Sequence, residues 1–174
     1  MFALYRRPLP HSTRETRREA EREASLSIIA EAFGPGSRLL HHPDGAPQIP
    51  EAPEGWVYSL SHSADECILA VGHGFGAIGV DVERERPQLV RVRCKFLSEN
   101  ELGWISETDM PALLRAWTAK EAVYKAARTP GLPLTAIELR SDFGEAVAAG
   151  RRYALSYPDE GAGRCVCVAM SLNP

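Results

Sequence analysis

The chain has 174 residues, of which 44% are hydrophobic and 25% are charged, as in an ordinary single globular domain. Its formal net charge of −3 gives no general attraction to nucleic acid or to an anionic membrane. No apolar run reaches the ~18 residues of a membrane span, and the first residues have no secretory signal pattern. The four cysteines lack metal-ligand spacing and are typical of reduced cysteines in a core. We therefore predict a cytoplasmic protein with neither a nucleic-acid nor a membrane partner.

The first third of the chain predicts one helix followed by a turn-rich segment. A helix is expected over residues 13–33, where Ala, Glu and Arg are frequent. Ser12 and Glu15 have capping-box spacing at its start, and Gly34 follows as a stop signal. Repeated prolines between residues 34 and 55 indicate turns.

The rest of the chain predicts strands and helices in a definite order. Strands are expected over residues 56–61, 67–72, 77–83, 134–141, 152–157 and 165–172. Two helices are expected between the third and fourth strands, near residues 98–105 and 111–128, and Ser98 and Glu101 have capping-box spacing. This order predicts an α+β fold made of two similar small halves packed together.

The strand expected over residues 77–83 carries two carboxylates on one face. Because side chains alternate along a strand, Gly79, Asp81 and Glu83 share a face opposite the apolar residues. Carboxylates two residues apart repel each other unless a cation or solvent lies between them, and the glycine leaves open space beside them. Taken alone, the pattern also fits the solvated face of an antiparallel strand.

The helix expected over residues 111–128 carries a charged pair inside its apolar stripe. At ~100° per residue, Glu121 and Lys125 fall on the apolar side. A surface Glu–Lys pair would contribute only ~0.3–0.5 kcal/mol and should lie on the polar side. Only three of the 20 basic residues are lysines, and two of them, Lys120 and Lys125, flank Glu121. Lysine is a compact charge suited to one phosphate oxygen or to proton transfer.

A third segment, Ser61-His62-Ser63, follows the first expected strand. On its own it is also typical of a turn whose side chains bind backbone groups.

The three carboxylates of Asp81, Glu83 and Glu121 offer hard oxygen ligands of the kind that Mg²⁺ prefers. Lys125, one helical turn beyond Glu121, would lie next to the phosphates of a substrate. This set of residues favours chemistry at a phosphoanhydride, where positioning and charge neutralisation supply most of the rate.

These segments resemble the motifs of the 4′-phosphopantetheinyl transferases, specifically the surfactin-synthetase-activating type. That family has a Ser-His-Ser segment, a Gly-Val/Ile-Asp-x-Glu strand and a Trp-Ser/Thr-x-Lys-Glu-x-x-x-Lys helix. The corresponding segments here are residues 61–63, 79–83 and 117–125, and residues 96–101 are similar to the family's Phe-x-Ser-x-x-Glu element. The match runs in family order over about residues 45–125.

The resemblance implies the 4′-phosphopantetheinyl transferase fold for residues 1–174 as a single domain. Its two pseudo-twofold-related halves, approximately 1–95 and 96–174, would each be a small antiparallel sheet with a helix. The coenzyme would lie in the cleft between the halves. A cleft completed within one chain favours a monomer.

The resemblance also implies a reaction, Mg²⁺-dependent transfer of the 4′-phosphopantetheine group from coenzyme A to a serine of an apo carrier protein. The carrier would belong to a fatty-acid, polyketide or peptide synthetase, and 3′,5′-ADP would be released. The implied enzyme is therefore a holo-[acyl-carrier-protein] synthase.

Individual roles follow from the same resemblance. The implied ligands of Mg²⁺ are Asp81, Glu83 and Glu121. Glu121, or a water on the metal, would take the proton of the attacking serine, and Lys125 would stabilise charge on the departing phosphate. Ser61 and His62 would bind the 3′-phosphate of the coenzyme.

The sequence departs from the family near residue 46. The usual Gly-Lys-Pro is Gly45-Ala46-Pro47 here, so a lysine contact to the coenzyme is missing. The available replacements are Arg6, Arg7, Arg17, Arg18 and Arg22.

Two other functions stay open. One is a non-catalytic module that binds coenzyme A or a carrier protein, and the other is a Mg²⁺-dependent nucleotide phosphohydrolase.

Overall fold

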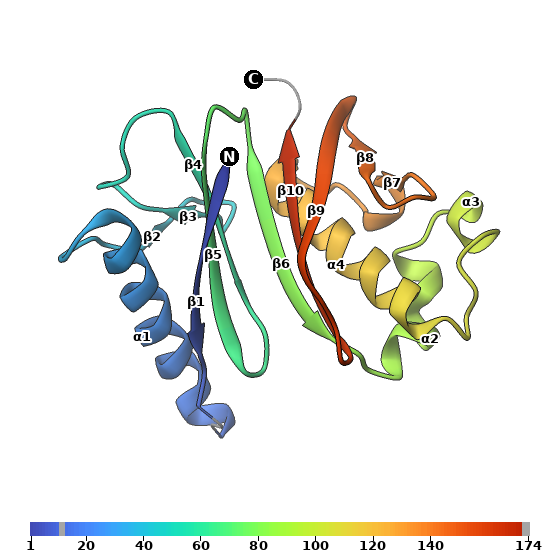
Figure 1. The fold of residues 1–174 in the computed structure, drawn as a ribbon, viewed down its shortest axis with the longest axis horizontal. Coiled ribbons are helices and arrows are strands. Elements are labelled where there is room, and N and C mark those ends of the chain that lie inside the picture. The colour runs from blue at the N-terminus through green and yellow to red at the C-terminus, as the bar shows by residue number, and fades with distance from the viewer. Residues whose placement is uncertain (11–12, 172–174) are drawn as a thin grey trace.

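The computed structural model describes residues 1–10 and 13–171, and none of the helices in these ranges is long and apolar enough to cross a membrane. Two antiparallel sheets lie next to each other, with the helix α1 against the first and the helix α4 against the second (Figure 1). Mixed helices and antiparallel sheets confirm the predicted α+β class. The pseudo-twofold relation between two halves stays a prediction.

The first sheet has the strand order β1-β5-β4 and packs against one long helix. Its elements are β1 (Phe2–Pro8), α1 (Arg14–Phe33), β4 (Trp56–His62) and β5 (Glu66–His73). A small hairpin of β2 (Leu40–His41) and β3 (Pro47–Gln48) lies between α1 and β4 in the chain. The helix α1 confirms the element expected over 13–33, and the side chain of Thr13 caps it by accepting from the Thr16 N–H. Ser12, the expected cap, lies outside the described residues.

The second sheet has the strand order β6-β10-β9-β8-β7. Its strands are β6 (Ile78–Arg84), β7 (Glu138–Leu139), β8 (Glu145–Ala148), β9 (Arg151–Gly161) and β10 (Arg164–Ser171). Its helices and turns are α2 (Gln88–Val92), η1 (Arg93–Lys95), α3 (Glu99–Leu102), α4 (Met110–Ala127) and η2 (Leu134–Ala136). The strand β6 precedes residue 95, the expected boundary between halves, yet it forms its ladder with β10.

Two strands differ from what the sequence predicted. The strand β1 was not predicted, and it pairs with β5 over its whole length, from Phe2 opposite Gly72 to Pro8 opposite Glu66. The strand expected over 134–141 is shorter, because a 3₁₀ turn at Leu134–Ala136 precedes a two-residue strand.

The strand β5 is buried on both faces, which explains its uninterrupted apolar sequence. Cys67, Leu69 and Val71 pack toward α1. Ile68 and Ala70 point the other way, into a layer shared with β6 and β10. The two sheets are therefore joined by a continuous apolar layer, and each carries its helix on the opposite side.

A buried ion pair ties α3 to α4 and to the start of the second sheet. The capping box that the sequence predicted at Ser98 and Glu101 is present. The Lys120 ammonium donates to Glu101 Oε2 at 2.5 Å and to the Ile137 carbonyl at 2.6 Å, while Glu101 Oε1 accepts from Leu139 N at 2.8 Å. Burial lowers the pKa of Lys120 despite the opposing influence of Glu101. Lys120 thus braces the scaffold.

We expect Glu101→Gln to lower the free energy of unfolding by about 3–5 kcal/mol, because it leaves the buried Lys120 ammonium without a counter-charge. The partners of Glu101 are all donors, so the new amide NH₂ must face at least one of them. Urea denaturation measures the loss, with Glu99→Gln at an exposed neighbouring position as the control. A loss below about 1 kcal/mol would contradict a structural role for the pair.

Candidate functional site

The backbone of α4 lies directly on β6 at Gly79. A Cβ atom at this glycine would lie 1.9 Å from the Ala122 carbonyl oxygen and 2.7 Å from the Ala126 nitrogen. The space expected to be open beside the two strand carboxylates is therefore filled by the helix, which corrects that expectation. The close packing brings the side chains of α4 next to those of β6.

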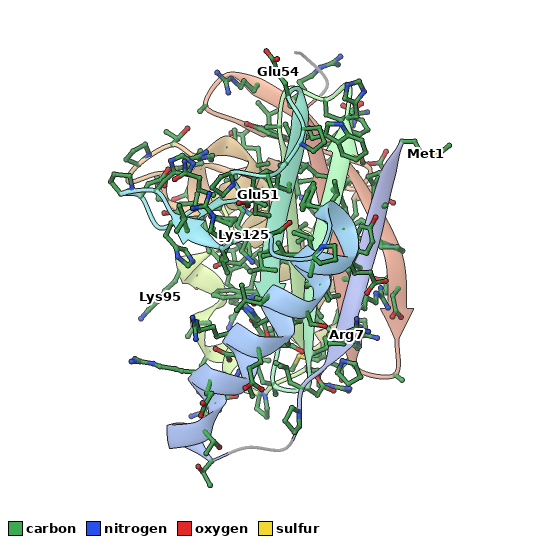
Figure 2. All side chains as sticks on the ribbon, turned by 90° about the vertical axis from the view of Figure 1, so that its left-hand side faces the viewer. Met1, Arg7, Glu51, Glu54, Lys95 and Lys125 are labelled. Carbon is green, nitrogen blue, oxygen red and sulfur yellow. The ribbon has the colours of Figure 1, made fainter. Side chains whose placement is uncertain are left out.

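Three of the predicted site residues, from three different elements, meet in one hydrogen-bonded group. The Lys125 ammonium, from α4, donates to Asp81 Oδ1 at 2.8 Å, to Ser61 Oγ at 2.9 Å and to the Val80 carbonyl at 3.0 Å. Ser61, on β4, donates its hydroxyl proton to Asp81 Oδ1 at 2.9 Å. Lys125 is labelled in Figure 2, which views the molecule from the side of α1. We call Ser61, Asp81 and Lys125 the lysine cluster.

The second oxygen of Asp81 has no partner among the described residues. The Asp81 side chain is 8% exposed, and its Oδ2 is buried without a hydrogen bond. A buried carboxylate oxygen without a partner is costly, and a cation or a donor on a ligand would satisfy it.

Glu83 and Glu121 lie in the electrostatic field of Asp81. Burial and then the Asp81 charge raise the pKa of Glu121, and the same two causes raise the pKa of Glu83. Glu83 Oε1 also accepts from Trp117 Nε1 at 3.4 Å and from Arg86 at 3.3 Å. Half-buried carboxylates that repel one another, together with the unpartnered oxygen of the buried Asp81, are a donor set that fits a hard divalent cation.

The side chains nevertheless do not form a closed metal site as they lie. Across residues 1–10 and 13–171, no group of three or more His, Cys, Asp or Glu side chains is placed to hold a metal ion. The Lys125 ammonium lies on Asp81, where a metal ligand would otherwise be available. Convergence of Asp81, Glu83 and Glu121 on one ion therefore stays a prediction.

His62 lies apart from the lysine cluster, on the other face of β4. Its Nε2 lies 2.8 Å from Ser25 Oγ on α1, and Ser25 donates its own proton to the Glu21 carbonyl at 2.6 Å. Burial lowers the pKa of His62, so the imidazole is neutral at pH 7. Ser61 and His62 are adjacent in the sequence but face different neighbours.

A cleft of about 660 Å³ opens beside Lys125. It is lined by the loop at residues 42–47, by residues 56–60 of β4, by residues 76–78 and by residues 124–131 at the end of α4. The side chains of Trp56 and Tyr124 are about 40% exposed there. The cleft thus combines apolar aromatic walls with a cation, a composition suited to a small charged ligand.

Sequence reasoning missed Trp56, Tyr124 and Arg128, which also line the cleft. Trp56 and Arg128 lie outside the motifs, and Tyr124 occupies one of the unspecified positions of the 117–125 motif. Trp56, on β4, is far in the chain from the other two. The one available signal was the position of Tyr124, next to Lys125 on the same helix.

A comparison with protein-family models matches residues 77–167 to the 4′-phosphopantetheinyl transferase superfamily. A comparison with curated proteins gives no match. The matched segment begins just before β6 and contains α4, so it includes the strand and the helix that carry Asp81 and Lys125. Because the match spans more than half of the residues, the chain belongs to the 4′-phosphopantetheinyl transferase superfamily.

Proposed function

We propose that the chain transfers the 4′-phosphopantetheine group of coenzyme A to a serine of an apo carrier protein, as an enzyme of the surfactin-synthetase-activating type. The observation that carries this proposal is the lysine cluster, which lies beside a cleft in a chain of this superfamily. The carrier would belong to a fatty-acid, polyketide or peptide synthetase. We also propose that the protein acts as a cytoplasmic monomer with halves of about 1–95 and 96–174.

Lys125 would stabilise the developing negative charge during the transfer, and Glu121 would act as the general base. Lys125 lines the cleft and is partly exposed, so its ammonium can reach a phosphate oxygen and stabilise the charge that develops on the departing nucleotide. The raised pKa of Glu121 makes its carboxylate a stronger base than an ordinary glutamate. It would take the hydroxyl proton of the attacking serine, while the phosphoanhydride bond breaks and 3′,5′-ADP leaves.

Mg²⁺ is the proposed cofactor, and Asp81, Glu83 and Glu121 are the residues that would hold it. When bound, the ion supplies positive charge against the pyrophosphate of the coenzyme. The unpartnered Oδ2 of Asp81 is one of these oxygens. Ser61 would keep Asp81 oriented through the hydrogen bond to its other oxygen.

Ser61 and His62 remain proposed contacts of the coenzyme. The imidazole of His62 is neutral and hydrogen-bonded to Ser25, so it would bind the 3′-phosphate as a hydrogen-bond donor after leaving that contact. Ser61 would bind the phosphates from the face of β4 that bears the lysine cluster.

The test is incubation with coenzyme A, Mg²⁺ and a panel of apo carrier proteins, followed by intact-mass measurement. We expect one carrier or more to gain the mass of phosphopantetheine, and a chelator to prevent the gain. Cleavage of coenzyme A without a carrier would instead indicate a phosphohydrolase. Binding of coenzyme A without either product would indicate a non-catalytic module.

A further inference from the structure

The cleft contains an arginine for which the proposed reaction has no role so far. Besides two tyrosines, its ionisable lining residues are His42, Asp44, Lys125 and Arg128. The Lys125 ammonium is held by the lysine cluster. Arg128 directly follows α4 in the left-handed backbone region, with φ of 46°, and its backbone N–H donates to the Tyr124 carbonyl. This leaves its guanidinium as the other permanent positive charge of the cleft.

Arg128 is paired with a carboxylate of the facing loop. Its Nη2 and Nε donate to the single oxygen Asp44 Oδ2 at 2.9 Å and 3.3 Å. Both side chains are more than a third exposed, so the ion pair is of the kind that contributes only ~0–1 kcal/mol. The other oxygen of Asp44 accepts from the Ala46 N–H at 3.1 Å. Asp44 is therefore fixed by its own loop, and Arg128 can exchange it for another anion at little cost.

The arginines that the sequence offered as replacements for the missing lysine do not line this cleft. Arg6 is paired with Asp159, Arg7 with Glu31, and Arg17 with Glu21. In Figure 2, where both residues are labelled, Arg7 lies apart from Lys125. Ala46, which stands where the family has lysine, lines the same cleft as Arg128. That one of those arginines replaces the lysine stays a prediction, while Arg128 is the arginine that lines this cleft.

We propose that Arg128 binds a phosphate of the nucleotide end of the coenzyme, and that Asp44 is an internal anion which the phosphate displaces. This inference rests on the proposed function. The planar guanidinium matches phosphate oxygens two at a time and keeps its charge at any physiological pH. The exposed rings of Trp56 and Tyr124 in the same cleft offer apolar faces to the base of that nucleotide.

Two single variants have effects of opposite sign on coenzyme A binding if the proposal is right. Arg128→Ala should weaken binding about tenfold, the size of one lost charge-assisted contact. Asp44→Asn should strengthen binding by about twofold to fivefold, because the competing charge is removed and the loop contact to Ala46 is kept. Arg128→Lys should recover part of the loss. Titration calorimetry of the full chain with coenzyme A measures all three without a carrier protein.

A purely structural tie between α4 and the loop would give a different result. Either substitution would then break the tie, and both would weaken binding, which would overturn the proposal while leaving the proposed function intact. If the unchanged chain does not bind coenzyme A, both the proposed function and this inference are wrong. Arg38→Ala, which removes an exposed arginine paired with Glu51 outside the cleft, is the matched control and should change nothing.

A second ligand identifies which phosphate is bound. If 3′-dephospho-coenzyme A binds equally to the unchanged chain and to Arg128→Ala, the contact is with the 3′-phosphate. If the tenfold difference persists, the contact is with the pyrophosphate, and in both cases the proposal holds. Thermal melting of each variant checks that the fold is unchanged.

Discussion

Glu121→Gln is expected to abolish transfer and at the same time to make the protein more stable. Burial and the charge of Asp81 raise the pKa of Glu121 in the folded chain. The folded state therefore binds this proton more tightly than the unfolded state does. The contribution of Glu121 to the free energy of unfolding is fully present at a pH below its pKa in the unfolded chain. That contribution is lost as the pH rises through its pKa in the folded chain. In its charged form the half-buried carboxylate is repelled by Asp81, and a neutral glutamine removes the repulsion.

The stability part of this prediction is checked by thermal melting at several pH values. We expect Tm of Glu121→Gln to exceed that of the unchanged chain at pH 7, by about 2–4 °C for each kcal/mol gained. The difference should shrink as the pH falls below the ordinary pKa of a glutamate, because both side chains are then neutral. Mg²⁺ should raise Tm of the unchanged chain more than that of the variant, since it relieves the same repulsion.

The activity part is checked by the initial rate of mass gain on the carrier. Loss of a general base or of a metal ligand lowers such rates by at least ~10²-fold. Glu23→Gln, at an exposed position of α1, is the control and should change neither the rate nor Tm. A variant that keeps its rate would remove Glu121 from the mechanism. A variant that melts lower than the unchanged chain would contradict the repulsion.

Patterns within single elements predicted much of the local structure. The alternation at Gly79, Asp81 and Glu83 identified a strand that forms over Ile78–Arg84. The Ser98–Glu101 spacing identified a capping box that is present, and the apolar stripe that includes Lys125 identified α4. These features depend on contacts between residues close in the sequence, which is why the sequence alone reveals them.

Long-range pairing could not be read in the same way. The paired residues of β6 and β10 are 80 to 92 positions apart in the sequence, and β1 forms only because β5 offers it an edge. Arg128 and Asp44 meet across the cleft for a similar reason, through the packing of α4 on the second sheet and of the 42–47 loop beside the first.

The shared role predicted for Ser61 and His62 conflicts with the alternation of side chains along a strand. The period of two along a strand grouped Asp81 with Glu83, and the same period separates Ser61 from His62. In the structure Ser61 lies toward Lys125, whereas His62 lies toward Ser25. Adjacent residues of one motif can still serve one ligand, but only if the ligand or the histidine reaches around the strand.

Gly79→Ala is expected to have the largest effect on the fold. The new Cβ would lie 1.9 Å from the Ala122 carbonyl oxygen and 2.7 Å from the Ala126 nitrogen, both of which are backbone atoms of α4. No side chain can rotate to make room, so the whole helix must move away from β6. Such overpacking costs ~1–3 kcal/mol where a core can adjust, and a rigid helix backbone places this variant at the upper end or beyond.

The same movement should inactivate the molecules that remain folded. Lys125 reaches Asp81 and Ser61 only because α4 lies so close to β6, so a displaced helix separates the lysine cluster. Gly72→Ala is the matched control, because its Cβ at 2.8 Å meets the ring of Phe75, a side chain that can turn away. Both variants are compared by urea denaturation and by the carrier-transfer rate at a temperature where both are folded. Gly79→Ala should unfold at a lower urea concentration and transfer more slowly than Gly72→Ala. If Gly79→Ala unfolds at the same urea concentration as Gly72→Ala and transfers as fast, the close packing of α4 on β6 does not position the site.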